Sequence, residues 1–259
     1  MSHARAEAPA TLALLHLAPR PGEIGHNKRL IGDAVRRAAS LGARLAVTPE
    51  LAVSGYGFRD RIGTAWIAEG QAALLEWAGD LARQANLFLL LGTPEAGDHL
   101  FNSMILFGPD GARRGHHRKV LALKAGSESW STAGDRATVV AAGDIGRLGL
   151  FVCADMYSER LVGETAEQGV DLLVSSAAWA PGEHGPSGEW ERASLRTGRP
   201  VLVCNRTGVD ALDFTGARSV AAAGGSLTFA HASAEAALVL VDWERRSRQL
   251  SNWRPVPCG

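Results

Sequence analysis

The sequence predicts a mixed α/β fold in which helices cover β-sheets, and we expect one domain spanning residues 1–259. Short apolar runs of strand length alternate along the chain with segments that carry apolar residues at helical spacing. Some neighbouring apolar runs are joined by tight-turn residues, which predicts antiparallel pairs that a purely parallel sheet lacks. No fixed-period repeat, low-complexity run or linker divides the sequence.

Strands and helices alternate in the first half of the chain. An apolar run at residues 11–17 is closed by a proline-rich loop, and in the helix that follows Leu30, Ala34 and Ala38 share one face. Gly42 ends this helix. The predicted elements of this half are a strand at residues 11–17, a helix at 27–41, a strand at 44–48, a helix at 71–84 and a strand at 87–91.

The second half begins with a predicted hairpin. Asp110-Gly111 separates the apolar residues 102–107 from residues 113–120, and this dipeptide is typical of a tight hairpin turn. The polar residues 127–135 are expected to form a loop. The later predicted elements are a strand pair at 137–142 and 145–152, a helix at 157–168, a strand at 171–175, a helix at 187–197, a strand at 200–204 and short strands within 215–243.

The composition disfavours several classes of partner. The 27 basic and 27 acidic side chains balance, which argues against binding to nucleic acid or an anionic membrane. No stretch reaches the roughly 18 apolar residues of a membrane span, and residues 1–10, which we expect to be flexible, lack a signal-peptide core. The three cysteines lack the spacing of a disulfide framework or a zinc site. We therefore expect a cytoplasmic protein.

Cys153 lies at a predicted turn between a strand and a helix. Phe151 and Val152 end the apolar run before it, and Leu161 and Val162 fall at helical spacing after it. At such a turn, backbone N–H groups and the helix dipole lower the pKa of a thiol and can hold an oxyanion. Taken alone, the pattern fits a buried core cysteine better, because free cysteine is among the most buried residue types.

Glu50 and Lys119 also stand at the ends of predicted strands. Glu50 alone fits a solvated loop carboxylate, and Lys119 alone fits an exposed basic cluster at residues 113–119. Together with Cys153 they supply what amide hydrolysis by a thiol requires. A carboxylate can move the protons, while the ammonium group and the Ala154 N–H stabilise the oxyanion. This combination favours catalysis over the separate structural interpretations.

A cysteine–histidine hydrolase is the weaker hypothesis. His116 and His117 directly precede Arg118 and Lys119, and His16 falls within a predicted strand. His184 and His231 are expected in or near loops. None of these histidines is an evident partner for Cys153, and the carboxylate scheme needs none.

Three blocks of residues, in this order, carry a family resemblance. They are Thr48-Pro49-Glu50-Leu51 with Ser54-Gly55-Tyr56, then His117-Arg118-Lys119-Val120, then Phe151-Val152-Cys153-Ala154-Asp155 with Glu159. The chain thereby resembles the nitrilase superfamily of carbon–nitrogen hydrolases, in its amidase-like branch. Supporting segments extend the resemblance over nearly the whole chain: Phe101-Asn102-Ser103, Pro109-Asp110-Gly111, Ala133-Gly134-Asp135, residues 169–174, 176–179 and 192–205, and Gly216 with Ser219.

The resemblance implies a four-layer α-β-β-α sandwich, usually paired across a helical face as a homodimer or assembled into a larger homo-oligomer. It implies a catalytic triad of Glu50, Lys119 and Cys153 that works without a metal or an organic cofactor. A second family glutamate matches Glu128 by its place before Trp130. This glutamate would orient Lys119 and the nitrogen of the substrate.

Departures from the family pattern narrow the expected substrate. Nitrilases typically carry Trp and Glu after the cysteine, whereas this chain has Ala154-Asp155, which favours amides over nitriles. Members that bind a substrate carboxylate place an arginine where this chain has Tyr157 and Ser158, so carboxylate recognition is disfavoured. The expected activity is hydrolysis of a linear amide of a small or medium molecule through a cysteine thioester.

Aromatic side chains near the three blocks are candidates for the substrate pocket or for ordinary core positions. They are Tyr56, Phe58, Trp130, Tyr157 and Trp179. Three alternatives to amide hydrolysis stay open: a nitrilase, a thioester-based N-acyltransferase and a non-catalytic binding protein. No catalytic role is expected for Cys204 or Cys258.

Overall fold

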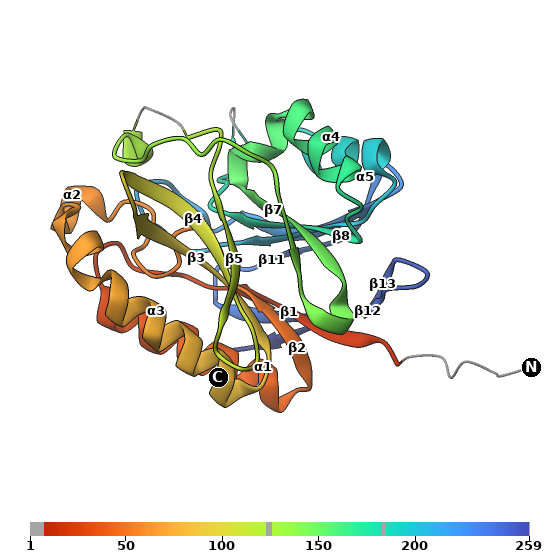
Figure 1. Ribbon diagram of the computed structural model, residues 1–259, viewed down its shortest axis with the longest axis horizontal. Coiled ribbons are helices and arrows are strands. Elements are labelled where there is room, and N and C mark those ends of the chain that lie inside the picture. The colour runs from red at the N-terminus through yellow and green to blue at the C-terminus, as the bar shows by residue number, and fades with distance from the viewer. Residues whose placement is uncertain (1–7, 123–125, 183–184, 259) are drawn as a thin grey trace, which may run out of the picture.

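Two β-sheets stack face to face and helices cover their outer faces, giving the four-layer α-β-β-α sandwich (Figure 1). The computed structural model describes residues 8–122, 126–182 and 185–258. The helices are α1 (Ile24–Ser40), α2 (Arg59–Ile62), α3 (Ala65–Ala85), α4 (Glu159–Glu167) and α5 (Glu189–Thr197), with 3₁₀ turns η1 (Gly126–Glu128), η2 (Gly143–Ile145) and η3 (Cys153–Tyr157). No helix within these ranges is long and apolar enough to cross a membrane.

The two sheets differ in size but share a mixed topology. The seven-stranded sheet contains, in spatial order, β13 (Gln249–Pro257), β12 (Ala237–Glu244), β1 (Ala10–His16), β2 (Ala43–Val47), β3 (Phe88–Ala96), β4 (Leu100–Phe107) and β5 (Arg113–Arg118). The six-stranded sheet contains β11 (Ser226–Ala232), β10 (Arg218–Ala223), β9 (Val201–Asn205), β8 (Leu172–Ala177), β7 (Arg147–Val152) and β6 (Thr138–Ala141).

The alternation of side chains along β1 shows how one strand serves two cores. Leu12 and Leu14 pack into the core between the two sheets, whereas Ala13 and Leu15 pack against α1 and α3. Successive side chains of a strand point to opposite faces, so a strand buried on both faces reads as a continuous apolar run. Helices α4 and α5 cover the other sheet on the opposite side of the molecule (Figure 1).

Strand direction brings the carboxyl ends of several strands to one region. Strands β1, β2 and β3 run parallel, and so do β7, β8 and β9. Strand β5 is antiparallel to β4, which is antiparallel to β3, so β5 ends at the same edge as β2. The Ser176 Oγ donates to the Thr48 carbonyl at 2.8 Å and joins the end of β2 to that of β8.

Most predicted elements are present, but some expectations were wrong. The four-residue α2 and the edge strand β13 were not predicted. Helix α2 is too short to show a period, and β13 contains Pro255 and Pro257, which strands tolerate at sheet edges. His231 is the penultimate residue of β11, next to the loop that follows, whereas Ala10 begins β1 instead of belonging to a flexible end. Residues 1–7 and His184 lie outside the described residues.

A neutral histidine is built into the core at the end of β1. His16 is fully buried, and its Nδ1 lies 2.9 Å from the Ser219 Oγ. Its ring packs edge-on against His231, with ring centroids 5.2 Å apart. Burial, with the charge of His231, lowers the pKa of His16 from 6.5 to about 4.

This histidine is expected to make the fold acid-sensitive. Below pH 6.5 the unfolded chain binds a proton at His16, while the folded chain does not do so until about pH 4. The stability from neutral His16 is thus complete above pH 6.5 and is lost as the pH falls to 4, by about 3 kcal/mol. Urea unfolding at pH 7 and pH 4 should show a smaller acid loss for His16→Asn than for wild type. Equal losses would contradict the assignment.

Candidate active site

Glu50 follows β2 and its carboxylate is completely buried. Its Oε1 accepts hydrogen bonds from the Lys119 Nζ at 2.8 Å and the Asn102 Nδ2 at 2.7 Å. Its Oε2 accepts from the Ala178 N–H at 2.9 Å. The chain reaches this position because β3 carries Gly92, where a Cβ would lie 2.2 Å from the Pro49 carbonyl oxygen.

Lys119 follows β5 and turns its ammonium group inward, where it is also buried. Its Nζ donates to the Glu50 Oε1 at 2.8 Å and to both carboxylate oxygens of Glu128 at 2.7 Å. Burial alone would lower the pKa of Lys119, but Glu50, Cys153 and Glu128 together raise it well above its ordinary range. Lys119 therefore stays charged. Its burial contradicts its interpretation as part of an exposed basic cluster.

Glu128 ends η1 and places a second carboxylate on Lys119. Burial, reinforced by the charge of Glu50, raises the pKa of Glu128 to about 7. Hydrogen bonds from Lys119 and Asn102 act in the opposite direction by favouring the charged form. The two glutamates thus share one ammonium group, and the pKa of Glu128 is raised toward neutral pH.

Asn102 is a member of this cluster that the sequence did not reveal as a site residue. Its Nδ2 donates to Glu50 and to Glu128, both at 2.7 Å. Its backbone carbonyl accepts from the Lys119 N–H at 2.8 Å. One buried side chain on β4 therefore bridges the two carboxylates. The available signal was a polar amide in a largely apolar strand, since such a group is unfavourable to bury without partners.

Cys153 directly follows β7 and is the first residue of η3. Its backbone adopts the left-handed region, with φ of +47°, which non-glycine residues adopt infrequently and which clusters at functional sites. Only 7% of the residue is exposed. The β7–η3 turn therefore holds the sulfur in a fixed, mostly enclosed position.

The expected lowering of the Cys153 pKa was wrong. Burial and the charge of Glu50 raise the pKa of the thiol well above its ordinary range, although Lys119 and the Ala178 N–H act to lower it. The dipole of an α-helix, which was expected to act on the Cys153 thiol, is absent there because a 3₁₀ turn follows the cysteine and α4 begins only at Glu159. Cys153 therefore rests as a thiol, and a base must remove its proton.

The aromatic candidates divide into two tyrosines that interact electrostatically with Cys153 and two tryptophans that pack against other aromatic rings. Tyr56 and Tyr157 lie within electrostatic reach of Cys153, and burial is the largest cause that raises the pKa of each phenol. Trp130 packs against Phe58 with ring centroids 5.1 Å apart. Trp179 packs against Tyr157 at 4.9 Å. Ala154, the residue after Cys153, is buried.

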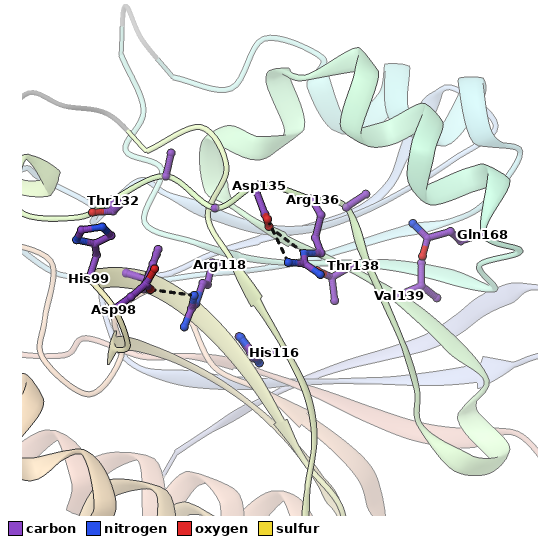
Figure 2. A pocket seen from close by; sticks show the side chains of 14 residues that line it. Asp98, His99, His116, Arg118, Thr132, Asp135, Arg136, Thr138, Val139 and Gln168 are labelled. Carbon is purple, nitrogen blue, oxygen red and sulfur yellow. Dashed lines mark hydrogen bonds and ion pairs between the residues drawn. The ribbon is translucent and has the colours of Figure 1, made fainter.

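A polar cleft of about 720 Å³ is lined by residues of β5 and by residues 132–139 (Figure 2). Arg118 points into it beside Asp98, and Asp135 pairs there with Arg136. Lys119, the next residue along the chain, points instead toward Glu50. The cleft and the buried cluster therefore occupy opposite sides of one strand end. In the described ranges, no group of three or more potential ligand side chains could hold a metal ion.

Comparison with known proteins places this geometry in a family. The pattern of the carbon–nitrogen hydrolase family matches residues 11–248. A chloroplastic omega-amidase of Arabidopsis thaliana is 28% identical over 172 residues, which are 60% of this chain and 44% of that protein. A nitrilase of Pyrococcus abyssi is 28% identical over 171 residues, covering 64% of each chain.

A solved structure resembles the whole fold. It is a glutamate-to-glutamine mutant of the amidase from Nesterenkonia sp., with the acetamide moiety of fluoroacetamide added covalently to its active-site cysteine. It is 26% identical, has a TM-score of 0.83, and the match covers 94% of this chain and 93% of that one. The fold, the family match and the three blocks agree, and the chain belongs to the carbon–nitrogen hydrolase family of the nitrilase superfamily.

Proposed function

We propose that this protein is a thiol amidohydrolase that cleaves a linear amide C–N bond of a small or medium molecule. The observation that carries the proposal is the buried cluster of Glu50, Lys119 and Glu128 beside Cys153. Burying three charged side chains is costly unless they are paired, and strongly perturbed pKa values of this kind mark functional sites. The cluster supplies a nucleophile, a base and a cation in one enclosed place.

The first half of the proposed reaction forms a thioester. Glu50 takes the proton of the Cys153 thiol as the sulfur attacks the carbonyl carbon of the amide. The oxygen of the tetrahedral intermediate carries the negative charge, which the Lys119 ammonium and the Ala154 N–H stabilise. Protonated Glu50 then gives its proton to the nitrogen, the C–N bond breaks, and ammonia or an amine leaves.

The second half releases the acid. Glu50 takes a proton from a water molecule, which attacks the thioester carbon, and the C–S bond breaks. The proton returns from Glu50 to the sulfur and restores the thiol. Because burial and Glu50 raise the pKa of Cys153, the thiolate forms only as the substrate is attacked. Glu128 holds Lys119 through two contacts of 2.7 Å and faces the site as the second acid group.

The substrate is proposed to be a neutral amide. Around the cluster lie Tyr56, Trp130, Tyr157 and Trp179, which we propose line a largely apolar pocket. Buried Arg206 lies within electrostatic reach of Tyr56, and it is already paired with Asp210. The acetamide adduct on the cysteine of the Nesterenkonia amidase supports a cysteine nucleophile in this fold.

The proposal extends to the setting in which the enzyme works. We propose one domain, a homodimer or larger homo-oligomer, and a reducing cytoplasmic location. The three cysteines, Cys153, Cys204 and Cys258, are all free thiols, which agrees with a reducing compartment. No metal or organic cofactor enters the proposed chemistry.

A substrate screen tests the function directly. Purified protein is incubated with linear amides, carbamoyl compounds and nitriles, and ammonia release is measured with Cys153→Ala as the blank. We expect release from amides by the wild-type protein alone. Release from nitriles instead would favour a nitrilase, and acceleration by added amines would favour acyl transfer. Equal release by Cys153→Ala would contradict a cysteine nucleophile.

A further inference from the structure

Asp155 is a buried carboxylate that the proposed chemistry does not use. It is fully buried, and both oxygens accept two hydrogen bonds each. Its Oδ1 accepts from the backbone N–H groups of Val120 at 2.9 Å and Leu121 at 2.8 Å. Its Oδ2 accepts from the Val152 N–H at 2.9 Å and lies 2.9 Å from the His117 Nε2. No oxygen of Asp155 is left for a substrate.

These partners belong to two different sheets. Val120 directly follows Lys119 at the end of β5, in the seven-stranded sheet. Val152 ends β7, in the six-stranded sheet, and directly precedes Cys153. Asp155 therefore ties the segment that carries the ammonium group to the turn that carries the thiol. A single side chain spans the gap between two reacting groups that come from separate sheets.

The turn at Cys153 needs such support. A non-glycine residue at a φ of +47° is held there only when its surroundings determine the conformation. The hydrogen bond from the Val152 N–H to Asp155 closes this turn on itself. Without an acceptor at this point, the turn is free to relax toward ordinary backbone angles.

His117 completes the arrangement. Its ring is buried, with Nδ1 3.0 Å from the Thr138 Oγ1 and Nε2 facing Asp155. The threonine fixes the ring between β6 and the carboxylate. Burial alone would raise the pKa of Asp155, but hydrogen bonds from His117, Leu121 and Val152 lower it below its ordinary value. Asp155 is thus ionised and accepts from all four donors.

We propose that Asp155, held by His117, is a positioning residue that sets the place of the Lys119 ammonium group relative to the Cys153 sulfur. This inference rests on the proposed function, because the two groups it aligns are the proposed nucleophile and oxyanion site. Asp155 acts through the backbone on both sides of the gap. Its effect belongs to the chemical step, since a misplacement of about 1 Å can cost about 100-fold in rate.

The first test replaces Asp155 by asparagine, whose amide group keeps the size but presents donors to backbone N–H groups. We expect kcat to fall about 100-fold while KM changes less than about twofold. Asp171→Asn is the matched control, because Asp171 accepts from the Arg147 N–H at 2.9 Å at the opposite end of β7. The control should keep its kcat. An Asp155→Asn protein with wild-type kcat and reduced thermal stability would overturn the proposal.

A second pair of variants covers the case in which Asp155→Asn does not fold. His117→Gln retains a donor near the position of Nε2, whereas His117→Leu leaves the Oδ2 of Asp155 with the Val152 N–H as its one remaining donor. We expect His117→Gln to keep most of the wild-type kcat and His117→Leu to lose at least about tenfold, with similar KM values. Equal kcat values for these two variants would overturn the role of His117.

A third readout separates this proposal from the proposed function. Alkylation of Cys153 by iodoacetamide, followed site by site by mass spectrometry across pH, needs no turnover. If Asp155 holds Lys119 beside the thiol, the midpoint of alkylation should move to higher pH in Asp155→Asn and stay unchanged in Asp171→Asn. If wild type hydrolyses no amide, this shift still supports the positioning role. An unchanged midpoint in Asp155→Asn contradicts it even where amide turnover is found.

Discussion

Replacing Lys119 by methionine is expected to lower kcat/KM for the best amide about 1,000-fold, because the oxyanion loses its cation. The same change leaves the buried carboxylates of Glu50 and Glu128 without their shared cation. We expect the free energy of unfolding to fall by about 3 to 5 kcal/mol. Initial rates and urea unfolding curves measure the two effects.

The loss of stability in Lys119→Met should depend on pH. Without the ammonium group, the buried carboxyl group of Glu128 loses the partner that favours its charged form, so its pKa rises further above that of the unfolded chain. The folded variant then binds more protons than the unfolded one, and its stability falls as the pH rises from 6 to 8. Lys28→Met, on the surface of α1, is the control. Wild-type kcat/KM in Lys119→Met would contradict the assigned role.

Replacing Glu50 by glutamine is expected to lower kcat at least about 1,000-fold with little change in KM. Glutamine keeps the volume of the side chain and can still accept from the Ala178 N–H, but its amide cannot take the thiol proton. The resting thiol has a raised pKa, so it cannot supply thiolate unaided at neutral pH. Steady-state kinetics at pH 7 to 8 measure the effect.

Glu95→Gln is the matched control for Glu50→Gln. Glu95 is a nearly buried carboxylate on β3, and it accepts from the Ser103 Oγ at 2.6 Å and from the Arg118 Nη2 at 2.8 Å, outside the cluster. Its replacement should change stability but leave kcat within about threefold of wild type. A Glu50→Gln enzyme that matches Glu95→Gln in kcat would remove Glu50 from the chemistry.

The positions of the three proposed catalytic residues could be predicted because each follows a strand. Apolar runs with turn residues after them marked the ends of β2 and β7, and these ends place Glu50 and Cys153. Strand topology then explains why Lys119, at the end of β5, reaches the same region. The many basic residues at 113–118 suggested an exposed segment, so the burial of Lys119 was not predicted. This burial follows from the stacking of the second sheet and not from local composition.

Other features depend on contacts that a local pattern does not contain. Asn102 bridges two glutamates that lie far from it along the chain, so its role appears only when the fold brings β4 close to the end of β2 and to η1. The pKa of Cys153 depends on how much water the two sheets exclude and on the charge of Glu50. The left-handed backbone of Cys153 is likewise set by the turn between β7 and η3.

The covalent state of Cys153 during turnover tests the central claim most directly. Wild-type protein is mixed with an amide substrate, quenched in acid within the first turnovers, and digested for mass spectrometry. We expect an acyl group on Cys153, with the mass of the substrate minus its amine, and no such group on Cys204 or Cys258. Amide turnover with no acyl group on Cys153, or with turnover retained in Cys153→Ala, would contradict it.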